Sequence, residues 1–437
     1  MLMVYNKVTD MSDNIASTAA STEASVLFAT HTTQSGHVIG EMTLNSPKSL
    51  NALSIDMCQL MSAKLTQWQN DSKVVAVLLR GSGDKAFCAG GDIRKLYDSM
   101  LDNPPMPNPY ATDFFGSEYA LYRQMHFYGK PIILWGNGII MGGGMGLMAA
   151  CSHRIVTETT KFAMPEISIG LFPDASGSWF LQRMPAKTGL FLGLTGALCN
   201  ARDAKFASLA EYALPSSQYQ QVIDTLAAAA WEDAPASSAL YSQAHRVAHH
   251  SLAELEQSAN AADNADVVFK PSKLAEHWAS IQTLMVSGGL KEIDARLQDD
   301  AALAEIDPNF AEDSWTQRAL ATYRAGCPVT AALTYELFHR VKDLSLEQIL
   351  YVEANVAVHC ANNPDFKEGV RALLIDKDKN PNWSRTLQHC LSQEGRAYIN
   401  SHFDNPYPKG EHIFQEWLSV ECKGSLMAQN LTHEAQS

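Results

Sequence analysis

Two carboxylates, Glu166 and Asp174, stand eight residues apart, and each directly follows a proline. Pro165 and Pro173 restrict the backbone and lack an amide donor, so each acid is expected in a defined extended or turn conformation. Carboxylates that are held in this way can transfer protons or attack an electrophilic carbon. This pair is the first candidate for catalysis in the sequence.

Two glycine-rich turns precede the carboxylates, one at residues 87–92 and the other at residues 142–146. Glycine allows backbone amides to approach a ligand closely. Backbone N–H groups can hold the oxyanion that develops when a carbonyl carbon is attacked. Two amide-rich turns followed by two carboxylates are therefore the groups that acyl chemistry requires.

Other kinds of chemistry have less support. The triple glycine lacks the third glycine of a dinucleotide fingerprint, because Leu147 stands at that position. No Gly-x-Ser-x-Gly elbow occurs, and no His-x-x-x-His pair with an intervening glutamate predicts a zinc hydrolase. Cys88 lies inside the first turn, but we expect a buried thiol there and not a nucleophile. The proposed acyl chemistry requires neither a metal nor an organic cofactor.

Composition limits the partners and the compartment. The 437 residues carry a formal net charge of -14, which disfavours nonspecific binding to nucleic acid or to an anionic membrane. No apolar run reaches the ~20 residues that span a bilayer. Eight cysteines without a Cys-x-x-Cys pair predict free thiols in a reducing compartment. Residues 1–24 contain no arginine, which argues against a mitochondrial transit peptide, so we expect a disordered start and a cytoplasmic location.

The pattern of strands and helices predicts an α/β protein with three parts: a disordered segment (1–24), an α/β core of repeated ββα units (25–215) and a mainly helical C-terminal region (216–437). Strands are expected at 25–30, 37–44, 74–79, 131–135, 154–156 and around Phe162, and helices at 54–68, from Asp92, from the triple glycine to Cys151, and at 179–184, 189–194, 201–210, 218–230 and 345–355. The segment 259–267 is polar and is expected to be a loop. Glu118 lies in a helical stretch, where local evidence alone favours a solvated helix face.

Several of these segments together resemble the crotonase (enoyl-CoA hydratase/isomerase) superfamily. The segments that carry the resemblance are 45–53, 87–93, 137–146 and 164–166. Three further segments, 170–174, 194–197 and 368–378, are most similar to the branch that hydrolyses 3-hydroxyisobutyryl-CoA. The resemblance implies a spiral core of ββα units and an acyl-CoA substrate.

The resemblance also implies roles for individual residues. The backbone amides of Gly91 and Gly143 would form the oxyanion hole. Glu166 matches the acid that hydratases and the hydrolase share, and Asp174 matches the second carboxylate of the hydrolase. Glu118 matches a glutamate that contacts the substrate. These five residues are the predicted site.

The implied reaction is hydrolysis of a short branched 3-hydroxyacyl-CoA, giving 3-hydroxyisobutyrate and CoA, a step of valine catabolism. The other catalytic glutamate of hydratases would fall at Gly146, which cannot transfer a proton. Two alternatives remain open: an enoyl-CoA hydratase or isomerase that uses Asp174 in place of the missing acid, and a CoA-binding protein with little catalysis. A homo-oligomer is possible. The basic residues near the motifs that could hold the CoA phosphates are Lys48, Lys85, Arg94 and Lys95.

Overall fold

The fold is described from a computed structural model, which covers residues 24–234, 243–261 and 269–418. The segment expected to be disordered, 1–24, lies outside these residues except for Ala24.

The larger of two sheets has six strands in the order β1-β2-β3-β5-β7-β10. All neighbouring pairs are parallel except β1 and β2. Its strands are β1 (Val26–Thr32), β2 (Val38–Leu44), β3 (Val74–Gly81), β5 (Ile132–Gly136), β7 (His153–Val156) and β10 (Tyr212–Ala213). Residues 74–79 are buried throughout, as a continuous apolar run in a strand covered on both faces should be.

The smaller sheet has the order β4-β6-β8-β9, and β4, β6 and β8 are parallel. Its strands are β4 (Ala86–Cys88), β6 (Ile139–Met141), β8 (Lys161–Ala163) and β9 (Cys199–Asn200). The chain alternates between the sheets, because β3 is followed by β4, β5 by β6 and β7 by β8. Each turn of the chain therefore adds one strand to each sheet before the next helix. This arrangement confirms the predicted spiral of ββα units.

The core helices whose starts the sequence predicts begin within two residues of those positions, and α3 had no predicted start. The side chains of Ser54 and Asp92 accept hydrogen bonds from the first turns of α1 and α2 and cap these helices, which confirms the helix starts predicted at the two residues. The last of these helices, α7, ends at Phe206, before the predicted end at residue 210. The core helices are α1 (Ile55–Gln69), α2 (Ile93–Met100), α3 (Pro109–His126), α4 (Gly143–Ala150), α5 (Gly177–Phe180), α6 (Thr188–Thr195) and α7 (Ala201–Phe206).

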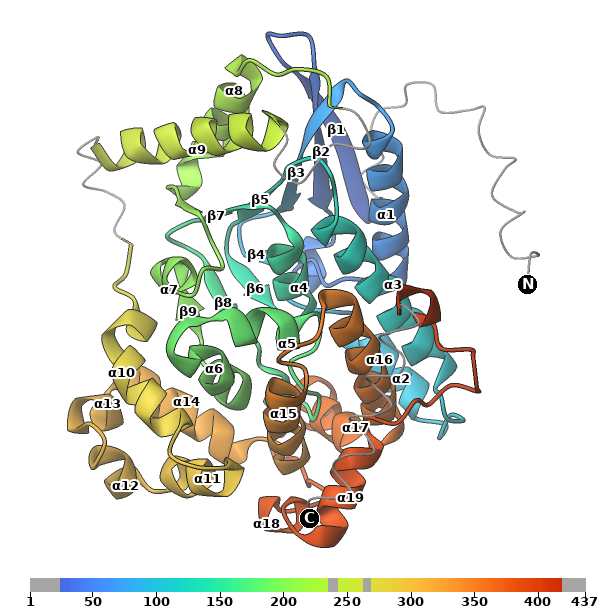
Figure 1. The fold of residues 1–437 in the computed structure, drawn as a ribbon, viewed down its shortest axis with the longest axis vertical. Coiled ribbons are helices and arrows are strands. Elements are labelled where there is room, and N and C mark those ends of the chain that lie inside the picture. The colour runs from blue at the N-terminus through green and yellow to red at the C-terminus, as the bar shows by residue number, and fades with distance from the viewer. Residues whose placement is uncertain (1–23, 235–242, 262–268, 419–437) are drawn as a thin grey trace.

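Beyond β10, the described residues contain helices and no further strand. Figure 1 shows that α10–α14 lie beside α6. The helices α15–α17 extend over the core between α5 and α2. These helices are α8 (Tyr219–Ala228), α9 (Gln243–Ala261), α10 (Lys273–Met285), α11 (Leu290–Gln298), α12 (Asp300–Ala304), α13 (Pro308–Glu312), α14 (Ser314–Ala325), α15 (Pro328–Arg340), α16 (Leu346–Asn362), α17 (Pro364–Val370), α18 (Leu387–Cys390) and α19 (Gln393–Ser401). The loop predicted at 259–267 is wrong for residues 259–261, which belong to α9. Residues 262–267 lie outside the described part of the chain.

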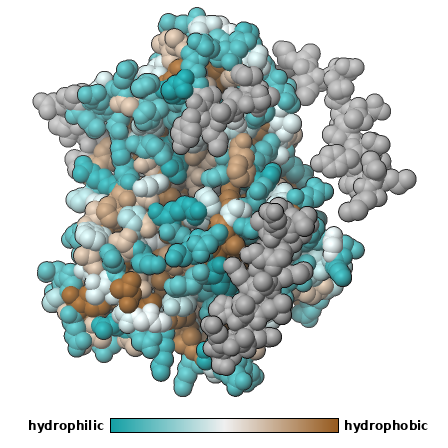
Figure 2. Space-filling model, in the orientation of Figure 1, coloured by the Kyte–Doolittle hydropathy of each residue, from teal (hydrophilic) through white to brown (hydrophobic). Residues whose placement is uncertain are grey.

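The surface carries mixed polar and apolar residues. The face in Figure 2 is mostly hydrophilic, with hydrophobic residues gathered at its lower left over the α11–α13 region. Among the described helices, none combines the length with the apolar composition that crossing a bilayer requires.

The C-terminal helices pack directly on the segment between the two predicted acids. Gly170 has a φ of 75°, and any side chain there would collide with the backbone of Asp365 at the start of α17. A side chain at Gly369 would likewise collide with the backbone of Ile169. The two glycines therefore permit backbone-to-backbone contact between α17 and the segment between the two predicted acids.

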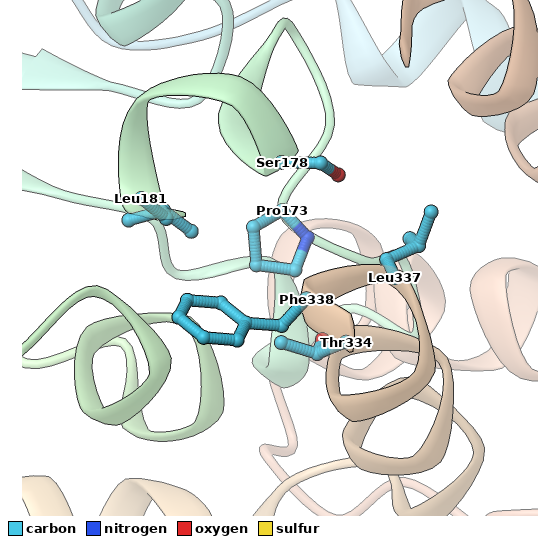
Figure 3. Close-up of a pocket in the computed structure, with 6 residues that line it drawn as sticks. All are labelled: Pro173, Ser178, Leu181, Thr334, Leu337 and Phe338. Carbon is cyan, nitrogen blue, oxygen red and sulfur yellow. The ribbon is translucent and has the colours of Figure 1, made fainter. Parts of the chain in front are cut away.

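A second contact lies just before Asp174. Pro173 faces Leu337 and Phe338 of α15 across a cavity of about 10 Å³ that Leu181 also lines (Figure 3). A cavity of this size holds at most about one water molecule. The segment that carries the second acid is thus packed on both sides by C-terminal helices.

Candidate active site

Three neighbouring parallel strands end at the candidate site. The first glycine turn follows β4, the second follows β6, and Pro165-Glu166 follows β8. The carboxyl ends of parallel strands meet at one edge of a sheet, so three segments that are distant in sequence come together there. They line a pocket of about 160 Å³. All five predicted residues line it: Gly91, Glu118, Gly143, Glu166 and Asp174.

The Gly91 amide is directed by the peptide that contains it. The carbonyl of Gly90 accepts a hydrogen bond from the N–H of Leu53, at 2.8 Å. In a trans peptide the N–H points opposite to the carbonyl. The Gly91 N–H therefore points away from Leu53, and Gly91 lines the pocket. This amide is available as one donor of an oxyanion hole.

Gly143 supplies the second amide. It is the first residue of α4, so its N–H has no carbonyl partner one turn earlier in the helix. Gly142 reaches this helix start with a φ of 48°, which a residue with a side chain adopts only with strain. A side chain at Gly143 would collide with Glu118 Oε1. The turn therefore needs both glycines to present its amide to the pocket.

Glu166 begins a short 3₁₀ turn directly after Pro165. The residue is 4% exposed, and its Oε2 is buried without a hydrogen-bond partner in the described structure. Burial, with the nearby carboxylate of Asp174, raises the pKa of Glu166 well above its usual range. A buried carboxyl oxygen without a partner is costly unless it serves a bound molecule. Glu166 thus has a free oxygen and a shifted pKa, as a general base or nucleophile needs.

Asp174 is also buried, and its carboxylate accepts a hydrogen bond. The hydroxyl of Tyr119 donates to Asp174 Oδ2 at 2.7 Å. Burial raises the pKa of Asp174 to about 6, and the bond from Tyr119 opposes that rise. The next two residues, Ala175 and Ser176, have φ values of 56° and 63°. Asp174 is therefore held by a strained turn on one side and by Tyr119 on the other.

Glu118 is 2% exposed, so the solvated helix face that local evidence favoured is wrong. Burial, with the charge of Asp174, raises the pKa of Glu118 to about 8. The hydroxyl of Tyr122 lies 2.6 Å from Glu118 Oε1 and 2.8 Å from the carbonyl oxygen of Gly143. The Tyr122 hydroxyl therefore links the carboxyl group of Glu118 to the backbone of Gly143. Glu118 thus holds the second glycine turn in place.

A fourth buried acid, Glu353 of α16, was not found from the sequence. Its Oε2 accepts from the N–H of Ser176 at 2.8 Å, and its Oε1 accepts from the N–H of Ser178 at 2.9 Å. Burial raises the pKa of Glu353 to about 8, although the two donors favour the ionised form. Glu353 therefore fastens the turn after Asp174 to a helix of the C-terminal region. The one sequence signal that could have indicated it is the position of this acid between Val352 and Ala354, on a helix whose residues are mostly buried.

Replacing Glu353 by Gln should destabilise the fold. The amide offers one acceptor where two backbone N–H groups need two, so one buried donor loses its partner. Such a loss costs about 1–3 kcal/mol. Chemical denaturation of both proteins measures the difference in the free energy of unfolding. The control is Glu347→Gln on the same helix, a half-buried partner of Arg123, for which we expect about 0–1 kcal/mol. Equal effects of the two substitutions would contradict this assignment.

The surroundings of Gly146 leave no room for the second catalytic glutamate that hydratases carry at this position. A side chain there would lie 2.6 Å from the ring of Tyr122 and 2.8 Å from the carbonyl oxygen of Ala175. Both groups belong to the elements that carry the buried acids. A glutamate at this position would therefore push Tyr122 and Ala175 out of place, so it could not serve as a second catalytic acid here.

The other candidate groups lie elsewhere. Burial raises the pKa of Cys88 to about 12, which fits the buried, unreactive thiol that we expected. Arg94 donates to the carbonyl oxygen of Leu374, and Lys95 pairs with Asp92. All four candidates for the CoA phosphates are exposed, and none of them lines the pocket: Lys48, Lys85, Arg94 and Lys95.

One cluster of possible metal ligands occurs among the described residues, away from the pocket. It joins Glu276 and His277 of α10 to Asp313. The ammonium of Lys273 already bonds both carboxylates, at 2.8 and 2.6 Å. The positive charge of Lys273 thus already offsets the negative charges of Glu276 and Asp313.

Comparisons with known proteins agree with this geometry. A family model described as enoyl-CoA hydratase/isomerase matches residues 39–399. A Danio rerio protein named 3-hydroxyisobutyryl-CoA hydrolase, mitochondrial, is 34% identical over 355 residues, covering 81% of this chain and 85% of that protein. The protein of the same name from Homo sapiens is 31% identical over 364 residues, covering 83% and 86%.

Solved structures give the same fold under other names. One is titled an enoyl-CoA hydratase from Rhodobacter sphaeroides, with 30% identity and a TM-score of 0.68, covering 89% of this chain and 99% of that one. Another is titled a carnitinyl-CoA dehydratase from Mycobacterium thermoresistibile, with 29% identity and a TM-score of 0.69, covering 88% and 98%.

Proposed function

The chain belongs to the enoyl-CoA hydratase/isomerase family, and from that premise we propose that it hydrolyses the thioester of a short branched 3-hydroxyacyl-CoA, with 3-hydroxyisobutyryl-CoA as substrate. The products are 3-hydroxyisobutyrate and CoA. The observation that carries the proposal is the buried pair Glu166 and Asp174 beside two backbone amides, with no room for a second hydratase acid at Gly146. The name that the curated relatives share supports it.

The amides of Gly91 and Gly143 receive the thioester carbonyl oxygen. As the carbonyl carbon is attacked, negative charge moves onto this oxygen and both hydrogen bonds strengthen. One such donor is worth about 3–4 kcal/mol of transition-state stabilisation. The two together can therefore supply a large part of the rate.

Glu166 supplies the attacking group in one of two ways. Its carboxylate can attack the carbonyl carbon and release the CoA thiolate, leaving a mixed anhydride that water then cleaves. Alternatively, it can take a proton from a water molecule as that water attacks the same carbon. Both routes require ionised Glu166. Neither route calls for a metal or an organic cofactor, and CoA enters only as part of the substrate.

Asp174 binds the substrate hydroxyl or the water. Tyr119 occupies one of its oxygens, so the other can accept a hydrogen bond from the substrate. Its charge also opposes ionisation of Glu166. Binding a hydroxyl against Asp174 would offset part of that charge at the moment when Glu166 must act.

Thiol release tests the proposal. Wild-type protein should liberate CoA from 3-hydroxyisobutyryl-CoA and should hydrate crotonyl-CoA at a far lower rate, because a hydratase pair lacks one acid. A thiol reagent follows the first reaction, and loss of enoyl absorbance follows the second. Faster hydration than thiol release would favour the hydratase that the titles of the solved structures suggest. Binding of CoA without either reaction would favour the non-catalytic alternative.

The cytoplasmic location stays a prediction, because the similar vertebrate proteins are named as mitochondrial. The described cysteines are all free and buried, and this fits a reducing compartment of either kind. A homo-oligomer also stays a prediction. Cell fractionation and analytical ultracentrifugation address these two points.

A further inference from the structure

We propose that the π-helical turn Arg371–Ile375 forms the wall that limits the length of the acyl group. This inference rests on the proposed function and adds a determinant of its substrate class. The turn lies in the C-terminal motif 368–378, for which the family resemblance gave no role. π-Helical turns are rare and occur frequently at functional sites.

Leu373 and Leu374 bring this turn into the pocket. They line it together with residues that otherwise all lie between Ala89 and Asp174. Leu374 is half-buried, and Leu373 is 38% exposed. The core thus builds the catalytic side of the pocket, and the C-terminal motif adds an apolar side to it.

The position of the turn places this wall beside the acids. Gly369 contacts the backbone of Ile169, which lies between Glu166 and Asp174 and also lines the pocket. Leu374 follows Gly369 by little more than one helical turn. The wall therefore stands beside the segment where the acyl group must lie for Glu166 to reach its carbonyl carbon.

Ion pairs hold the turn in shape. The guanidinium of Arg371 bonds both oxygens of Glu368, at 2.8 and 2.9 Å. Its other nitrogen bonds Asp376 at 2.6 Å and Asp378 at 2.7 Å. A planar guanidinium fixes its partners in direction, and it suits such a hub better than an ammonium does. The residues on both sides of Leu373 and Leu374 are thereby anchored to one side chain.

A separate contact joins the wall to the oxyanion turn. Arg94 Nη2 donates to the carbonyl oxygen of Leu374 at 3.1 Å. Arg94 belongs to α2, which begins just after Gly91. The wall is therefore placed relative to an oxyanion donor as well as to Glu166, and its distance from the reacting carbonyl is fixed.

The pocket is small, and this makes the wall selective. Its volume of about 160 Å³ lies below the usual 300–1,000 Å³ of ligand pockets. One additional methylene in such an apolar pocket changes selectivity by about 10–200-fold. A rigid leucine wall can therefore separate a short branched acyl group from a longer chain.

The test is the acyl-length profile of Leu374→Ala. Thiol release is measured with isobutyryl-CoA, hexanoyl-CoA and octanoyl-CoA. The ratio of kcat/KM for octanoyl-CoA to that for isobutyryl-CoA should rise at least about tenfold over wild type. Leu374→Phe should lower the same ratio, and this keeps the inference testable if the alanine variant does not fold.

The matched control is Ile375→Ala on the same turn, which is 37% exposed and does not line the pocket. Its ratio should stay within about twofold of wild type. An unchanged ratio in both Leu374 variants would overturn the inference, as would an equal rise in KM for all esters, which indicates contact with the pantetheine arm. Absence of thiol release from every ester by folded wild-type protein would instead overturn the proposed function.

Discussion

Glu166→Gln should lower kcat for thioester hydrolysis by at least about 10²-fold, the lower range for loss of a general base. Glutamine keeps the size of the side chain but can neither accept a proton nor attack the carbonyl carbon. KM should change little, because the amides of Gly91 and Gly143 still bind the carbonyl oxygen. Steady-state thiol release with 3-hydroxyisobutyryl-CoA measures both constants.

The pH dependence supplies a second measure of the same role. The raised pKa of Glu166 means that the inactive, protonated acid persists to higher pH than an ordinary glutamic acid would. Wild-type kcat should therefore rise as the pH increases through this pKa and fall as the pH decreases. In the glutamine variant this dependence should disappear. The control is Glu305→Gln on the surface, for which we expect unchanged kinetics. Near-normal turnover of folded Glu166→Gln would exclude Glu166 as base or nucleophile.

Asp174→Ala should abolish the preference for hydroxylated substrates. A site that bonds a substrate hydroxyl can reject the analogue without it by up to about 10⁴-fold. The alanine variant lacks the acceptor, so kcat/KM should fall much further for 3-hydroxyisobutyryl-CoA than for isobutyryl-CoA. Comparing the two esters in both proteins measures this change. The plain ester is the internal control, because it shares every contact except the hydroxyl.

Removing Asp174 also removes a charge that raises the pKa of Glu166. The acid limb of the rate profile should therefore move to lower pH in Asp174→Ala. An equal fall for both esters together with this movement would assign Asp174 to the chemistry and not to recognition. Unchanged rates for both esters would mean that Asp174 only shapes the turn after Pro173.

Local patterns predicted the core well. The apolar run at 74–79, the helix starts at Ser54 and Asp92 and the glycine turns each depend on neighbouring residues, and the structure confirms them. The grouping of the site also followed from the order of segments that resembles the family. The structure gives the physical reason for that grouping, because β4, β6 and β8 are parallel neighbours whose carboxyl ends meet at the pocket.

Contacts between distant segments could not be predicted in this way. Glu118 reads as solvated until Tyr122 and the second glycine turn enclose it. Glu353 gains its importance from two amides that lie in another part of the chain. Leu374 reads as an ordinary helical leucine until the packing of Gly369 on Ile169 brings its turn to the pocket. In each case the structural role of the residue depends on a contact with a partner that sequence spacing does not reveal.

The anchoring of Ser176 by Glu353 has a consequence for synthesis on the ribosome. The two residues are 177 positions apart, which corresponds to roughly 10–35 s of translation at about 5–20 residues per second. During this interval the turn after Asp174 lacks the carboxylate that binds the backbone amides of Ser176 and Ser178. The segment that carries the second acid therefore reaches its final conformation only after residue 353 has been added to the chain.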